Sequence, residues 1–376
     1  MSQPYSYEAR LKEKMKALRW QKMHLDPLLV FGLILLSIVG LFVLYSASNG
    51  DQLVVKKQGL HLIISFVLMI IAAQISPQRY KQWAPWLYFI GLFFLIAVLL
   101  IGKVDHGGRR WISFGFFRFQ PSELMILAMP MMLAWFFDDR PLPPINRSIF
   151  FALLFIFIPA GLIAKEPDLG TAIVVSLAGF FVLLLAGMRW RLIGIFLGAL
   201  ALASPLIWHF MHTYQKDRIL TFLNPARDPL GKGYHIIQSK IAIGSGGFLG
   251  KGFMHGTQSH LSFLPAHTTD FIFAVSGEEF GLIGCTLILL IFLGLFARCL
   301  WISIRAQNSF TRLLSGSLAF TFIVSAVINL GMVVGILPVV GVPLPLVSYG
   351  GSVMMILMIN FGIIMSIQTH RRLWAS

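Results

Sequence analysis

The chain alternates between long apolar runs and short polar segments over most of its length. About 20 apolar residues in a helix cross the hydrocarbon core of a bilayer, because each residue advances the helix by about 1.5 Å. Ten runs approach that length, so the pattern predicts an all-α integral membrane protein with about ten transmembrane helices. The runs lie near residues 27–48, 59–75, 83–102, 122–137, 148–164, 169–187, 191–212, 270–297, 313–335 and 346–367.

One connection is much longer than the others, because residues 213–269 separate the seventh and eighth runs. Glycines alternate there with short apolar patches, as in YHIIQSKIAIGSGGFLGKG, which indicates short amphipathic or re-entrant pieces at the membrane surface. The expected organisation is a polar N-terminal tail over residues 1–24 and a polytopic membrane domain over residues 25–376. The long loop belongs to that domain.

Basic residues between the runs predict an orientation. Ten spans place both ends of the chain on one side, and that side holds the basic tail and most of the basic residues of the short connections. Lys and Arg concentrate in the cytoplasmic segments of membrane proteins. Both termini are therefore expected in the cytoplasm, and the loop over residues 213–269 is expected on the extracytoplasmic side.

Composition agrees with a membrane protein and argues against a nucleic-acid binder. The 376 residues are 57% hydrophobic and 12% charged, whereas soluble domains carry about 25% charged residues. The net charge of +15 would suit nucleic acid. The basic residues, however, sit in short clusters between apolar runs instead of forming a stripe with interleaved aromatics. No nucleic-acid partner is expected.

Candidate functional residues gather at the ends of the runs that are expected to face outward. Ionisable side chains near a span are functional candidates by default, because burying them in lipid is costly. The candidates are Arg109, Arg110, Trp111 and Glu123 around the fourth run, Lys165 and Asp168 between the fifth and sixth, Asp270 before the eighth, and Ser348 and Tyr349 near the last outer connection.

Each of these has a simpler structural interpretation. Asp168 follows a proline and Asp270 follows two threonines, so either carboxylate suits the start of a helix. Arg109 and Arg110 suit interfacial anchors, with Trp111 in an aromatic belt. Spacing alone leaves both interpretations open for every one of these residues.

Glu278 and Glu279 are harder to explain. They lie eight and nine residues beyond Asp270, inside the predicted eighth helix. A bare carboxylate at that depth costs several kcal/mol, so each needs a cationic or hydrogen-bonding partner from another segment. Structural pairing and a role in the site are both consistent with the sequence.

Several separated blocks resemble the SEDS family (shape, elongation, division and sporulation), and within it the rod-shape-determining, RodA-type branch. They are RRW…RFQPSE, EPDLGTA, DPLGKGYHIIQSKIAIGSGGFLGKG, GTQSHLSFLP, TDFIFAVSGEEFGL and GILPVVGVPLPLVSYGGS. The similarity runs from the first span to the C-terminus. It implies a peptidoglycan glycosyltransferase of the bacterial cytoplasmic (inner) membrane that polymerises lipid II at the outer leaflet for lateral wall elongation and rod shape.

The resemblance also implies roles for individual residues and partners. The aspartate of the T-D-F-I-F block, essential in the family, is Asp270, and the other family positions fall on Arg110, Trp111, Glu123 and Asp168. The expected partners are a class B penicillin-binding protein, which cross-links the strands, and other membrane proteins of the elongation complex. Besides Asp270 as the catalytic residue, the implied substrate-binding set is Arg109, Arg110, Trp111, Glu123, Lys165, Asp168, Gln258, Ser348 and Tyr349.

The chain departs from the family pattern at three positions. Ile126 stands where members usually have a lysine, three residues after the glutamate of Q-P-S-E. Ala266 and Thr268 replace the usual glutamate and histidine shortly before Asp270. The supports of the catalytic aspartate and the cation that holds the lipid diphosphate are therefore expected to differ here.

The implied reaction needs one base and no acid. A glycosidase needs two carboxylates because its leaving alcohol must be protonated, whereas diphosphate leaves without a proton. Asp270 is expected to take the proton of the incoming hydroxyl in an inverting displacement, and partial burial is expected to raise its pKa.

Basic residues are expected to stabilise the diphosphate in this scheme, with or without a divalent cation held by Glu123 or Asp168. The alternatives are a lipid II flippase or transporter, which needs polar groups through the depth of the membrane, and a non-catalytic scaffold for a penicillin-binding protein.

Overall fold

The computed structural model describes residues 23–105, 108–114, 117–211, 213–228, 231–260 and 266–370. Its described part contains ten long helices, one for each apolar run, and seven of them are long and apolar enough to cross a membrane. The predicted all-α, multi-pass class is confirmed. The helices are α2 (Pro27–Ala47), α3 (Gln52–Gln74), α4 (Pro77–Ile101), α5 (Pro121–Asp138), α6 (Asn146–Lys165), α7 (Leu169–Leu185), α8 (Trp190–Phe210), α12 (Ile272–Ile304), α13 (Ser309–Val334) and α14 (Ser352–Thr369).

Local signals in the sequence explain where the first helices begin. Asp26 caps α2 by accepting a hydrogen bond of 3.0 Å from the backbone N–H of Leu29, and Asp51 caps α3 in the same way through Leu53. Asp26 also pairs with Arg298 of α12 at 2.6 Å. The cap of the first helix therefore ties it to a helix far along the chain.

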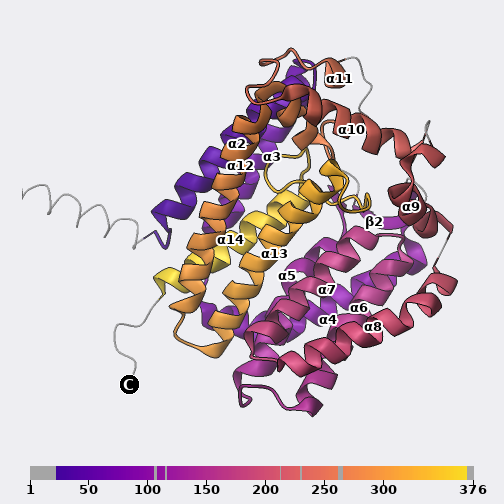
Figure 1. The fold of residues 1–376 in the computed structure, drawn as a ribbon. Coiled ribbons are helices and arrows are strands. Elements are labelled where there is room, and N and C mark those ends of the chain that lie inside the picture. The colour runs from indigo at the N-terminus through magenta and orange to yellow at the C-terminus, as the bar shows by residue number, and fades with distance from the viewer. Residues whose placement is uncertain are drawn as a thin grey trace, which may run out of the picture.

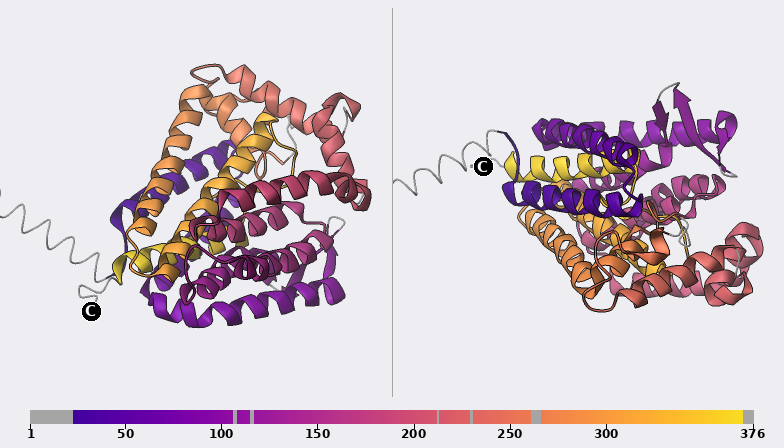
Figure 2. Two further views of the ribbon diagram at one scale, coloured as in Figure 1. Left: turned by 60° about the horizontal axis from the view of Figure 1, so that its bottom comes forward. Right: turned by 90° about the horizontal axis from the view of Figure 1, so that it is seen from above.

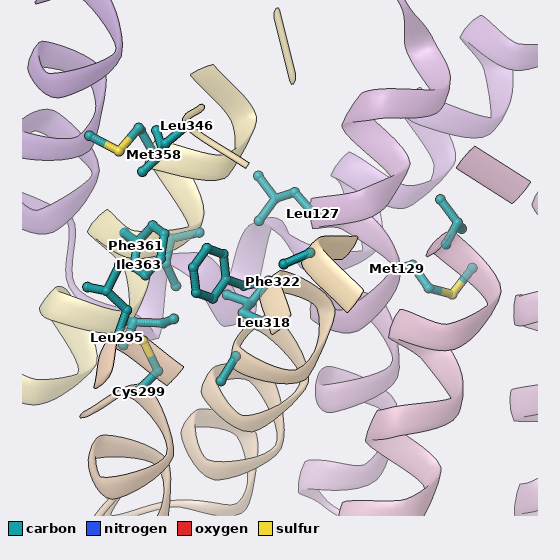
Figure 3. Close-up of a cluster of buried hydrophobic side chains, with 14 of the residues drawn as sticks. Leu127, Met129, Leu295, Cys299, Leu318, Phe322, Leu346, Met358, Phe361 and Ile363 are labelled. Carbon is teal, nitrogen blue, oxygen red and sulfur yellow. The ribbon is translucent and has the colours of Figure 1, made fainter. Parts of the chain in front are cut away.

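The helices pack closely where small residues allow it. Between apolar helices in lipid the driving force is van der Waals contact, so close approach matters more than apolar area. A Cβ on Gly362 would overlap the carbonyl oxygen of Met69, so the α14–α3 contact requires glycine there. Phe322 and Phe361 meet edge to face, 5.1 Å apart, in the buried cluster shown in Figure 3.

Short elements gather at one end of the bundle (Figure 1). Short helices form within residues 213–269, and a small antiparallel sheet in the order β1-β2-β3 forms between α4 and α5. The apolar-run pattern did not predict this sheet, because its strands are only 3 to 7 residues long. The elements are α9 (Thr213–Leu223), η1 (Pro225–Arg227), α10 (Lys232–Gly246), α11 (Thr257–His260), β1 (Lys103–Asp105), β2 (Gly108–Phe114) and β3 (Phe117–Phe119).

The two ends of the described chain meet at the opposite end of the bundle (Figures 1 and 2). The rings of His24 and His370 stack with centroids 3.9 Å apart, and His24 lies 3.2 Å from the Thr369 hydroxyl. The ten spans that the apolar runs predict would give this arrangement, because an even number of crossings returns a chain to the side where it began. Residues 1–22 of the expected N-terminal tail lie outside the described residues.

Helix α12 is broken at Gly281, where φ is 62° and ψ is −159°. The break frees backbone groups that a membrane helix must satisfy within the protein. Residues 247–252 satisfy them as an added strand would: the N–H of Lys251 donates to the carbonyl of Glu278 at 3.0 Å, and the N–H of Leu282 donates to that of Gly247 at 2.9 Å. The glycine-rich segment thus completes the helix.

The same contact gives the two glutamates partners. The carboxylate of Glu278 is fully buried and accepts from Lys251 Nζ at 2.7 Å, from the N–H of Thr257 at 2.8 Å and from the N–H of Gln258 at 3.1 Å. Glu279 accepts from the hydroxyl of Ser46 on α2. Of the two interpretations of this pair, structural pairing accounts for the contacts.

Candidate active site

A cavity of about 550 Å³ lies where helices α5, α7, α12 and α14 begin. Trp111, Glu123 and Asp270 line this cavity. Residues of α13, α14 and the segment before α14 also line it, most of them apolar, with Thr321, Ser325 and Asn360 as polar exceptions within the helices. A mostly apolar pocket with a few converging polar groups is the usual form of a ligand site.

Asp270 lies in the segment just before α12 and lines this cavity. Its Oδ2 faces Gly341, where a Cβ would lie 3.7 Å away. Burial raises the pKa of the Asp270 carboxyl, and the positive charge of Arg218 partly offsets that rise. The direction agrees with the expectation for a base at the edge of the membrane.

Hydrogen bonds from a side-chain hydroxyl and a backbone N–H hold the Asp270 segment against the segment before α14. The hydroxyl of Ser348 donates to the carbonyl of Thr269 at 2.6 Å and accepts from the N–H of Leu344 at 2.8 Å. The N–H of Tyr349 donates to the carbonyl of Thr268 at 2.9 Å. Because these contacts occupy the Ser348 hydroxyl, its place in the structure is that of a support for the segment.

Asp168 caps α7 and also reaches across to α5. Its Oδ1 accepts from the N–H of Thr171 at 3.1 Å, and its Oδ2 accepts from the Thr171 hydroxyl at 2.9 Å and from Gln120 Nε2 at 2.7 Å. Glu123, in the first turn of α5, accepts from the Ser352 hydroxyl of α14 at 2.9 Å. The helix-cap interpretation of Asp168 is confirmed, and the two acids link three helix starts beside the cavity.

Arg110 fastens β2 to the turn between α6 and α7. Its guanidinium donates to the carbonyl of Glu166 at 3.1 Å and to that of Pro167. Lys165 ends α6 with an exposed side chain. The side chain of Arg109 lies outside the described residues.

The structure brings together five of the predicted site residues and places others outside the cavity wall. Ile126, at the position where the family lysine is missing, also lines the cavity, so its wall is apolar at that point. The five that line it are Trp111, Glu123, Asp270, Ser348 and Tyr349. Those that do not are Arg110, Lys165, Asp168 and Gln258, the last of which is held by Glu278.

Comparison with known proteins decides the family. The family model for cell cycle proteins of the FtsW, RodA and SpoVE type matches residues 24–373. The chain belongs to this family. It is 49% identical over 355 residues to "Peptidoglycan glycosyltransferase MrdB" of Escherichia coli K12, covering 94% of this chain and 96% of that protein. The Helicobacter pylori J99 protein of the same name is 37% identical, covering 94% and 92%.

Solved structures agree with this assignment. One, described as "Structural coordination of polymerization and crosslinking by a peptidoglycan synthase complex", matches with a TM-score of 0.79 at 33% identity, covering 91% of this chain and 97% of that chain. The rod shape determining protein RodA of Thermus thermophilus matches with a TM-score of 0.70 at 28% identity, covering 91% and 96%. The resemblance to the SEDS family is confirmed.

The site contains residues that the sequence did not single out. Arg218 acts on the Asp270 carboxyl from α9, and nothing in its local sequence distinguishes it from other surface cations. Gln120 and Thr171, by contrast, lie within the RFQPSE and EPDLGTA blocks and were among the polar residues that the sequence pointed to. Gln58 of α3 donates to the carbonyl of Ser348 at 3.1 Å. The first turns of α3 are polar, so the pattern of apolar residues did not include Gln58 in the helix.

A divalent cation held by Glu123 or Asp168 was one expectation. Both carboxylates already accept hydrogen bonds from neighbouring side chains. Among the described residues, no group of three or more His, Cys, Asp or Glu side chains is placed to hold a metal ion. The hydrogen bonds of these two acids are those of links between helix starts.

Proposed function

We propose that this chain, a peptidoglycan glycosyltransferase, polymerises lipid II into β-1,4 glycan strands, with Asp270 as the general base. The observation that carries the proposal is the cavity beside Asp270, which joins a carboxylate to apolar walls at the ends of membrane helices. A lipid-linked sugar needs both environments. Its hydroxyl must meet a base, and its prenyl chain must remain in an apolar medium.

The N-termini of the helices around the cavity favour binding of the diphosphate leaving group. Each helix N-terminus carries a partial positive charge and unpaired N–H groups, which favour bound anions. Four helices begin at the cavity, and the loop before α14 supplies the adjacent glycines Gly350 and Gly351. Arg110, Lys165 and Arg218 add positive charge at the same end. Together these groups support binding of undecaprenyl diphosphate as it departs.

The reaction balances with one proton acceptor. The 4-hydroxyl of the acceptor GlcNAc attacks C1 of the donor MurNAc, and its proton passes to the Asp270 carboxylate. The bond from C1 to the diphosphate oxygen breaks as the new C–O bond forms, and undecaprenyl diphosphate leaves with the electron pair. A single displacement inverts C1, which converts an α-linked donor into a β-linked strand.

The proposal includes an orientation and partners. Both termini lie in the cytoplasm and the cavity opens toward the outer face of the cytoplasmic membrane. The basic residues concentrated at the end where the termini meet support this orientation. A class B penicillin-binding protein and other elongation proteins assemble with the chain. The solved relative described as a complex coordinating polymerisation and crosslinking supports the first of these partners.

Purified full-length protein in liposomes tests the function directly. With lipid II supplied, the chain should yield glycan polymer, measured by gel separation of the product, with and without a class B penicillin-binding protein. Translocation of lipid II across the bilayer without polymer would identify a flippase instead. Absence of both products in the presence of the transpeptidase would identify a scaffold.

The pH dependence of polymerisation is expected to report Asp270. Only the ionised carboxylate accepts a proton, so the rate falls as pH falls through its pKa. Because burial raises that pKa, the acidic limb of the initial rate should lie above about pH 3.9, the value for a free aspartate. The measurement is the initial rate of lipid II polymerisation from about pH 4 to about pH 8.

The Arg218→Gln variant provides the matching control for that profile. Removing the cation takes away the charge that lowers the Asp270 pKa, so the acidic limb should move to higher pH. Arg218→Lys keeps the charge and should leave the limb close to its wild-type position. An acidic limb that stays in place in Arg218→Gln would show that another group titrates.

A further inference from the structure

The carboxylate of Asp270 stands at the end of a segment without regular secondary structure. Residues 266–270 form turns, and α12 begins only at Ile272. A general base must be held close to the productive geometry, because a misplacement of about 1 Å can cost roughly a hundredfold in rate. The side chain at Asp270 therefore needs support from a rigid element nearby.

Asn329, on α13, supplies a direct contact of this kind. It is fully buried, and its Nδ2 donates to the backbone carbonyl of Asp270 at 2.9 Å and to that of Val342 at 2.8 Å. An amide nitrogen has two N–H groups, so each one serves a different segment. The residue next to Val342 is Gly341, the one that Asp270 Oδ2 faces. One amide thus joins the base to the wall opposite its carboxylate.

The side-chain oxygen of Asn329, unlike its nitrogen, lowers the stability of the fold. Asn329 Oδ1 is buried and accepts no hydrogen bond within the part of the chain that the structure describes. A buried acceptor without a partner costs about 1 to 3 kcal/mol, so such a group calls for an explanation. A hydroxyl side chain has a single O–H and could donate to only one of the two carbonyls, so serving both requires the amide nitrogen.

We propose that Asn329 is a positioning residue for Asp270, whose two N–H groups fix the backbone at Asp270 against Val342 so that the carboxylate points into the cavity. The proposal rests on the proposed function, in which Asp270 is the base. Asn329 does not line the cavity, so it acts through Asp270 and not on the lipid substrate. Its effect is therefore on turnover and not on substrate binding.

Two substitutions test the proposal on the purified full-length protein. Asn329→Leu keeps the size of the side chain and removes both donors, and Asn329→Ser keeps a single donor. Asn329→Leu should lower kcat for lipid II polymerisation by at least about tenfold while KM stays within about threefold of wild type. Asn329→Ser should fall between Asn329→Leu and wild type.

Ser317→Ala is the matched control, because Ser317 is also buried on α13 and donates to a carbonyl of another helix, that of Ala178 at 2.7 Å. Its kcat should match wild type. The proposal is overturned if Asn329→Leu keeps the wild-type kcat, or if KM rises instead. It is also overturned if both Asn329 variants yield less folded protein than Ser317→Ala, since the residue is then merely structural.

Asp270→Asn, assayed in parallel, separates the two proposals. If Asp270→Asn is inactive and Asn329→Leu is fully active, the positioning role alone fails. If Asp270→Asn keeps the wild-type rate, the proposed base fails, whatever Asn329 does. Low kcat in both Asp270→Asn and Asn329→Leu, with an unchanged KM in the latter, supports both proposals.

Discussion

Replacing Asp270 by asparagine is expected to abolish strand synthesis and to leave the fold intact. The amide matches the carboxylate in size but cannot accept the proton of the attacking hydroxyl, and general base catalysis contributes about 10² to 10⁴ in rate. The backbone carbonyl of Asp270, which anchors the segment through Asn329, is unaffected by the change. The measurement is the rate of lipid II polymerisation by purified protein, together with its thermal unfolding.

Asp139→Asn is a suitable control for this experiment. Asp139 follows α5 at the end of the bundle away from the cavity, and its side chain is 81% exposed, so the same chemical change should leave the rate unaltered. A rate for Asp270→Asn equal to that of this control would falsify the assignment of Asp270 as the base. Loss of folded protein in Asp270→Asn would instead mark the residue as structural.

Gly281→Ala is expected to cause a large loss of stability, although it adds only one methyl group. The backbone at Gly281 has φ 62° and ψ −159°, a region that only glycine occupies without strain. A Cβ there would also overlap the backbone nitrogen of Gly250 and lie 2.7 Å from the carbonyl of Phe248. Strain and overlap together should cost roughly 3 kcal/mol or more.

Gly294→Ala, in the same helix, isolates the cause. Its Cβ would meet nothing within 4 Å, and its φ lies outside the left-handed region, so alanine should be neutral or slightly stabilising. The comparison is the midpoint of thermal unfolding in detergent and the yield of monodisperse protein. Equal midpoints for the two variants would mean that the break in α12 does not depend on glycine.

Hydropathy predicted the ten long helices because each contains an apolar run close to the length that crosses a membrane, but it placed several ends wrongly. Helix α3 begins at Gln52 and not near residue 59, since its first turns carry Lys56, Lys57 and Gln58. The tenth run was expected from residue 346, yet α14 begins at Ser352. The apolar residues before it form a segment that lines the cavity, which apolar character alone does not distinguish from a helix.

The residues of the site were predictable only in part, because some of them meet only through tertiary contacts between distant segments. Family motifs pointed to Asp270, Glu123 and Trp111, and the structure places all three around one cavity. The contact between Asn329 and Asp270 joins residues 59 positions apart. No local pattern reports such a pairing, because it arises only when α13 packs beside the start of α12. Arg218 was missed for the same reason.

The break in α12 has a consequence for protein engineering and for comparison among relatives. The glycine-rich strip over residues 247–252 and the membrane helix beside it share one set of backbone hydrogen bonds, so neither is complete alone. A chimaera that exchanges the connection over residues 213–269 must therefore import the matching helical stretch around Gly281 as well. The two pieces must be exchanged together, although about thirty residues separate them along the chain.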